Sequence, residues 1–200
     1  MAHLKNKSEK RKEEILEAAL KCFNKKGYYR TSIDEIAHKT GLTKGAVYYY
    51  FKSKKKLFIE LFNFKMNPYF EKFTRQGAGG ESAAEQIWKT IVQQADRDFD
   101  NNLEIHKLAL EFLYVSSREK DVRQEASSFY KKKTVFFTEA IAAGIKSGAF
   151  KDLNPEMVAW NLNFLSIGFF LLYFATDVDF NPLKQHAINL KIFFEGITRS

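Results

Sequence analysis

The sequence predicts an all-α fold in which a small basic module precedes a larger, apolar-rich helical body. Apolar residues recur at helical spacing along nearly the whole chain, and no run alternates convincingly with period two as a strand would. Residues 31–54 predict two short helices joined by a tight turn at Gly41. Residues 1–56 hold fifteen Lys and Arg against six Asp and Glu, a net charge of +9, whereas the whole chain is +8. These observations predict a basic domain of residues 1–54 and a second domain of residues 55–200.

The first helix is predicted from about Ser8 to Lys26, and Gly27 should end it. Cys22 lies on its apolar face and is predicted to be a buried small hydrophobe. Because Cys22 is the only cysteine, no intrachain disulfide is possible and the cysteine content does not indicate secretion. The buried stripe of this helix consists of Ile15, Ala18, Ala19, Cys22 and Phe23.

The next two helices form the predicted helix-turn-helix. Ser32 and Glu35 have the spacing of a capping box, so a helix should begin at Ile33. Gly41 suits a left-handed helix end, and Thr43 is a plausible N-cap for the next helix, which runs through Tyr50. Such a unit presents its second helix to the major groove of DNA. The concentrated positive charge around it predicts a polyanionic partner.

The fourth helix should begin at Lys54, after Ser53 as its cap. Pro68 is expected to kink or break this helix, because proline lacks an N–H and its ring clashes with the preceding turn. The only glycine-rich break in the sequence, residues 76–80, predicts a boundary between modules.

Five further helices are predicted in the body. A second capping box, Ser82 with Glu85, opens the first of them. Asn154 and Asn181 each precede a proline, which is the pattern of an N-cap followed by proline at the first helical position. The five predicted ranges are about 82–99, 103–115, 119–146, 155–175 and 182–198.

The last two predicted helices are too apolar to be covered by one wall of a domain. The helix 155–175 is apolar on more than one face, which predicts that a second copy of the chain covers it. The sequence therefore predicts a homodimer through about 155–175 and 182–198. The alternative is that both helices are the core of a single globule.

Several classes of protein are disfavoured. The longest apolar stretch, residues 164–175, is shorter than the roughly 20 residues that span a bilayer, and the N-terminus is polar. We therefore expect a soluble cytoplasmic protein that does not contact membranes. No catalytic residues, metal site or cofactor are predicted. Residues 96–101 begin like a calcium loop, but the sixth position lacks glycine and Lys107 stands where the bidentate Glu belongs.

The body is rich in aromatic residues, most of which should be core. A minority is expected to line a pocket for an apolar or aromatic small molecule. Glu111 is a polar candidate for this pocket, although it would otherwise pair with a nearby Arg or face solvent. The predicted ligand-binding residues are Phe62, Met66, Trp88, Phe112, Glu111, Phe137, Asn163 and Phe164.

The N-terminal residues resemble the TetR/AcrR family of bacterial transcriptional regulators. The likeness covers about residues 11–62 and includes Thr31-Ser-Ile-Asp-Glu-Ile-Ala and Gly41-Leu-Thr-Lys-Gly-Ala-Val-Tyr-Tyr-Tyr-Phe-Lys-Ser-Lys. The resemblance implies about nine helices: a three-helix DNA-binding domain, and a larger domain for ligand binding and dimerisation. It also implies a repressor that binds a palindromic DNA operator as a homodimer and is released by a small molecule.

The resemblance also implies DNA contacts at the two short helices and at the start of the fourth. The residues expected closest to base edges are Thr43, Lys44, Gly45 and Ala46. Those expected at phosphates or the groove wall are Thr31, Ser32, Tyr48, Tyr49 and Lys54. The chain departs from the family pattern at Tyr50, often histidine, and at Lys55 and Lys56, which replace a common acidic pair. The lysines should strengthen backbone attraction.

Two other functions compete with the ligand-responsive repressor. One is a helical enzyme that uses acid–base residues such as Glu111 and His106, although no catalytic motif accompanies them. The other is a protein that coats DNA without sequence preference. Footprinting separates this second alternative from the repressor, since a coating protein would protect DNA uniformly.

Overall fold

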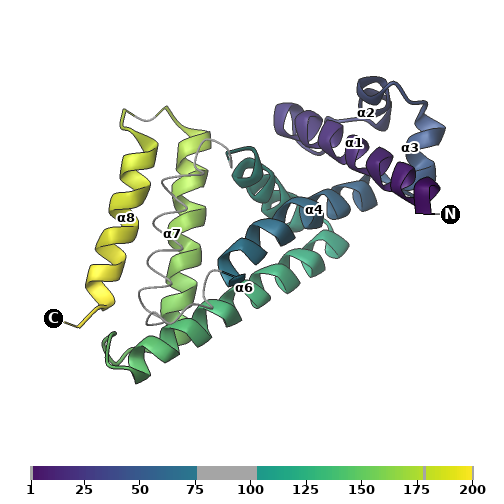
Figure 1. Ribbon diagram of the computed structural model, residues 1–200. Helices are drawn as coiled ribbons and strands as arrows, with labels where there is room; N and C mark the ends of the chain where they lie inside the picture. The colour runs from purple at the N-terminus through teal and green to yellow at the C-terminus, as the bar shows by residue number, and fades with distance from the viewer. Residues whose placement is uncertain (1, 76–102, 178, 200) are drawn as a thin grey trace. The chain divides into compact units, whose positions relative to one another are not determined.

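The computed structural model describes residues 2–75, 103–177 and 179–199, and every regular element within these ranges is an α-helix (Figure 1). The predicted helix 82–99, the capping box of Ser82 and Glu85, Trp88 and the segment 96–101 lie outside the described residues. The helices are α1 (Ala2–Lys26), α2 (Ile33–Thr40), α3 (Lys44–Tyr50), α4 (Lys54–Arg75), residues 103–116, α6 (Lys120–Lys146), α7 (Pro155–Ala175) and α8 (Pro182–Ile197).

The chain forms two compact units. The first comprises residues 1–67 and 104–126, and the second comprises residues 68–103 and 127–200. This division differs from the one predicted at residue 54, because the first half of α4 packs into the core of the basic module.

Aromatic side chains from three segments form the core of the first unit. Phe58 of α4 lies with its ring centroid 5.0 Å from that of Phe23 and 5.2 Å from that of Phe112. Phe62 stacks on Phe112 at 3.8 Å between centroids. Since aromatic pairs of this kind dominate core energetics, α4 and residues 103–116 fix the position of α1.

The ends of α2 and α3 are set by short-range hydrogen bonds, as predicted. Ser32 and Glu35 form a complete capping box, and Gly41 ends α2 with a left-handed φ of 66°. Thr43 caps α3 by accepting a hydrogen bond from the N–H of Ala46 at 3.2 Å. Each bond joins residues three apart, so the local sequence alone selects these helix boundaries.

α4 begins where predicted but does not end at the proline. The N–H of Lys56 donates to Ser53 Oγ at 3.0 Å, which confirms the cap. Pro68 lies inside the helix, which continues to Arg75. The helix therefore does not break at Pro68, and the kink that was the other expectation stays a prediction.

The described core of the second unit joins α6, α7 and α8. Asn154 and Asn181 cap α7 and α8 with proline at the start of each helix, as predicted. Gly144 of α6 allows close packing, because a Cβ there would lie 2.3 Å from the ring of Phe150. The core cluster is Phe137, Ile141, Phe150, Val158, Ala159, Leu162, Leu190, Phe194 and Ile197.

α7 and α8 lie side by side (Figure 1). Both helices leave large apolar side chains in contact with solvent. Phe164 of α7 is 62% exposed, and Ile192 of α8 is 63% exposed. By length and composition α7 is also apolar enough to cross a membrane, a property shared by core helices of soluble proteins. Together these features leave an apolar surface on α7 and α8, to which Met157, Phe164, Leu171, Leu172 and Ile192 contribute.

Candidate nucleic-acid interface

α3 turns one face into the first unit and the other to solvent. Val47 is fully buried, whereas Tyr49 is 75% exposed and Tyr48 is exposed beside it. Lys44 and Gly45 at the start of the helix are also exposed. The spacing that predicted Tyr49 opposite the core therefore agrees with the observed burial, and the outer face of α3 is free to enter a groove.

Lys44 forms an exposed ion pair with Asp34 of α2. Its Nζ lies 2.8 Å from Asp34 Oδ2, and both side chains are more than half exposed. The hydrogen bond to Asp34 raises the pKa of Lys44, so the ammonium stays charged. Exposed pairs of this kind contribute little stability, so Lys44 can exchange this partner for a DNA acceptor.

Ser32 and Thr43 are exposed N-caps, whereas Thr31 is buried. The Thr31 side chain is 2% exposed, and its hydroxyl donates to the carbonyl of Gly27 at 2.8 Å. A buried hydroxyl with this partner is not placed to bind phosphate. The structure thus gives Thr31 a part in the turn between α1 and α2.

Lys54 also has partners that the sequence did not reveal. Its Nζ donates to the carbonyls of Tyr28 at 2.9 Å, Tyr29 at 3.3 Å and Thr31 at 3.0 Å. It lies 4.5 Å from the centroid of the Tyr28 ring, and burial lowers its pKa. An ammonium has three donors, and here all three are used within the protein. The expectation of a phosphate contact is corrected accordingly: Lys54 holds the turn of residues 28–31.

Lys55 is also bound within the first unit, where two carboxylates balance its positive charge. Its Nζ lies 3.2 Å from Asp121 and 3.3 Å from Glu119, and hydrogen bonds to Asp121 and then Glu119 raise its pKa. The added backbone attraction expected from Lys55 is therefore offset inside the first unit. Lys56, by contrast, is exposed.

The predicted ligand-binding residues do not form one cluster. Phe62, Met66 and Phe112 are buried in the first unit. Glu111 accepts a hydrogen bond from the backbone N–H of Tyr28 at 2.5 Å, which gives this carboxylate a structural partner within the first unit. Phe137, Asn163 and Phe164 belong to the second unit, where Phe164 is exposed.

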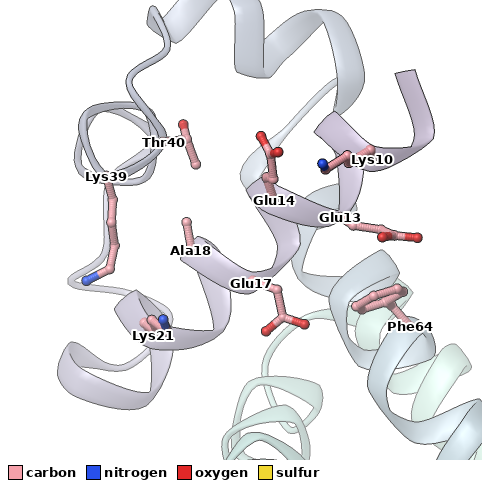
Figure 2. Close-up of a pocket in the computed structure, with 9 residues that line it drawn as sticks. All are labelled: Lys10, Glu13, Glu14, Glu17, Ala18, Lys21, Lys39, Thr40 and Phe64. Carbon is pink, nitrogen blue, oxygen red and sulfur yellow. The ribbon is translucent and has the colours of Figure 1, made fainter. Parts of the chain in front are cut away.

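A hollow of about 570 Å³ opens beside α1 in the first unit (Figure 2). Its lining mixes charges of both signs, and some of them are already paired: Arg11 with Glu14 at 2.6 Å, and Lys65 with Glu17 at 2.5 Å. Such a surface suits water better than an apolar effector. The lining residues are Lys10, Glu13, Glu14, Glu17, Ala18, Lys21, Lys39, Thr40 and Phe64.

One charged residue of the second unit escaped the sequence analysis. Lys133 lies on the inward face of α6, between Tyr130 and Phe137. Its spacing of three and four residues from these aromatic residues was the available signal.

A capped helix-turn-helix with an exposed polar and aromatic face on its second helix is the arrangement found in DNA-binding transcriptional regulators. The sequence pattern of the family described as "Bacterial regulatory proteins, tetR family" matches residues 15–61. The regulator YhgD of Bacillus subtilis, a helix-turn-helix protein, is 29% identical over 187 residues, which cover 89% of this chain and 90% of YhgD. These matches support the assignment of the chain to the TetR family of transcriptional regulators.

Solved structures share the fold over nearly the full chain. A transcriptional regulator from Saccharomonospora viridis in complex with choline superposes with a TM-score of 0.85 at 21% identity, covering 96% of this chain and 100% of the other. FadR of Bacillus subtilis in complex with stearoyl-CoA gives 0.76 at 21% identity, covering 92% and 98%. These likenesses confirm the predicted all-α architecture.

Proposed function

We propose that this protein is a repressor that binds a palindromic DNA operator as a homodimer and is released by a small molecule. The observation that carries the proposal is the exposed face of α3, where Lys44, Tyr48 and Tyr49 project from a rigidly capped helix. The positive charge of residues 1–56 supplies attraction to phosphate. Thr43, Gly45 and Ala46 would approach base edges from the same helix.

The apolar surface on α7 and α8 supports the homodimer. Large apolar patches on soluble proteins mark interaction sites, and a two-fold dimer would let two recognition helices read two half-sites. A second copy of the chain is a better occupant than lipid, since α7 also carries Asn161 and Glu156 on its exposed surface. We place the protein in the cytoplasm, where operator DNA is accessible.

An effector is proposed for the second unit, because aromatic side chains fill the core of the first unit and charged groups line its hollow. Two structural relatives were solved with chemically different molecules, choline and stearoyl-CoA, so the shared fold does not select the ligand. Of the residues proposed from sequence, Phe137 and Asn163 lie inside this unit.

Footprinting on the DNA around the protein's own gene tests the proposal. We expect protection of one inverted repeat, with Lys44→Ala altering which sequences are protected and the exposed Lys120→Ala serving as the control. Uniform protection along the fragment would instead support the coating protein, and no protection would refute DNA regulation at this locus.

A further inference from the structure

The inward face of α6 in the second unit carries polar groups that the DNA-binding function does not use. One face of the helix is formed by residues at positions i, i+3, i+4, i+7 and i+8, namely Tyr130, Lys133, Thr134, Phe137 and Thr138. Thr134 and Phe137 are each 5% exposed, so this face is turned into the unit.

Lys133 is the charged member of this face. Its Nζ lies 5.9 Å from the ring centroids of both Tyr130 and Phe137, a distance at which aromatic rings attract cations. Within the described ranges, Lys133 has neither an ion pair with a carboxylate nor a hydrogen-bond acceptor. Two ring faces compensate only partly for removing an ammonium from water.

Lys133 is largely covered by protein but is not sealed from solvent. Burial lowers the pKa of Lys133 to about 8, so the group is desolvated and still mostly protonated at neutral pH. Part of the side chain nevertheless remains accessible. Lys133 is therefore covered by protein on most sides, yet a small ligand group can reach it.

Two neighbouring polar groups lack part of their hydrogen bonding. Asn163 of α7 is completely buried, and its Nδ2 donates to Thr134 Oγ1 at 3.1 Å and to the Ala159 carbonyl at 3.3 Å. Its Oδ1 has no partner among the described residues, and neither has the buried Oγ1 of Thr138. Because buried polar atoms are nearly always paired, these atoms indicate a partner that the described chain does not supply.

We propose that Lys133 anchors the anionic end of an amphiphilic effector, a carboxylate or a phosphate, at this face of α6. The Thr138 hydroxyl can donate to the same group, while Asn163 Oδ1 can accept from an adjacent N–H or O–H. The rings of Tyr130 and Phe137 would pack on the apolar part. This inference rests on the proposed ligand-responsive function and narrows its ligand from an apolar molecule to one with a negatively charged end.

Matched probes on the full-length protein test the charge preference. Decanoate, hexadecanoate and decyl phosphate are compared with decanol and decyltrimethylammonium by isothermal titration, below their micelle concentrations. We expect an anionic probe to bind at least about tenfold more tightly than decanol, because charge-assisted hydrogen bonds are the strong ones. The cationic probe should bind more weakly still. The ratio of carboxylate to phosphate affinity identifies which headgroup the site takes.

Substitutions assign the preference to one residue. Lys133→Met keeps the length of the side chain and should reduce the anion-over-decanol ratio to about one. Lys133→Arg should keep the preference, and Lys132→Met, at an exposed position on the same helix, should leave it unchanged. Circular dichroism of each variant verifies that the fold is intact.

The inference is overturned if decanol binds the unaltered protein as well as the carboxylates do, if no anionic probe binds, or if Lys133→Met retains the preference. Operator release by the same probes is measured separately. If the probes show the charge preference but do not release operator DNA, ligand-induced release is refuted and the anion site at Lys133 is retained. If only neutral molecules release operator DNA, the proposed ligand-responsive repressor is supported and the anchoring role of Lys133 is refuted.

Discussion

Single side chains hold the turn between α1 and α2 from two directions. Lys54 donates to three carbonyls of residues 28–31, and Glu111 accepts the N–H of Tyr28. Glu111 Oε1 also lies 3.2 Å from the position of a Cβ at Gly27, whose φ is 77°. The turn that precedes the helix-turn-helix is thus fixed by charged groups from α4 and from residues 103–116.

Replacing Lys54 should reduce stability more than it alters the salt dependence of DNA binding. Lys54→Met leaves three carbonyls without their donor, which should lower the free energy of unfolding by about 1–3 kcal/mol in urea titrations. The slope of log affinity against log salt should stay close to that of the unaltered protein. Lys52→Met, at an exposed position, is the control. A slope that falls by about one unit would restore Lys54 as a phosphate contact.

Glu111 offers a second test at the same turn. Glu111→Ala removes the acceptor of the Tyr28 N–H and should lower the free energy of unfolding by about 1–3 kcal/mol. Glu111→Gln keeps an acceptor oxygen and should cost less. If both variants unfold at the same urea concentration as the unaltered protein, the hydrogen bond contributes nothing to stability.

Each helix of the recognition unit depends on its own caps. At the start of α2, Glu35 receives a hydrogen bond from Lys26 and another from the backbone N–H of Ser32, and these lower its pKa from 4.5 to about 2. Depression of the folded-state pKa means that the ionised carboxylate stabilises the fold.

The stabilisation from Glu35 should therefore disappear in acid. It is fully present above pH 4.5 and is lost as the pH falls from 4.5 towards 2. Glu35→Gln keeps the cap oxygen but cannot titrate, so thermal melting should show a weaker pH dependence in that window. Identical pH profiles for the two proteins would contradict the assignment.

At the scale of the whole molecule, the proposed homodimer rests on the apolar surface of α7 and α8. Because burial of this surface drives association, Phe164→Glu or Ile192→Glu should produce monomers in light scattering after gel filtration. Operator affinity should fall with the loss of the second recognition helix. Lys191→Glu, at an exposed polar position beside Ile192, should remain dimeric. If both glutamate variants remain dimeric, the dimer interface does not lie on this surface.

The sequence by itself determined where α2, α3, α7 and α8 begin and which face of α3 points outward. Helix caps and stops act across only a few residues, so the local sequence is enough to predict them. This holds for the caps at Ser32, Thr43, Asn154 and Asn181 and for the stop at Gly41. The same short range explains why the predicted bounds of α7 agree with the observed ones.

Only the tertiary structure decided where several charged groups are used. Lys54 and Glu111 looked available in the sequence, but their partners at Tyr28 are 26 and 83 residues away. It also moved the first half of α4 into the core of the basic module and turned Lys133 inward. Hydrogen bonds and burial between distant segments depend on how the helices pack. Helical periodicity does not show which distant group will lie beside a given residue.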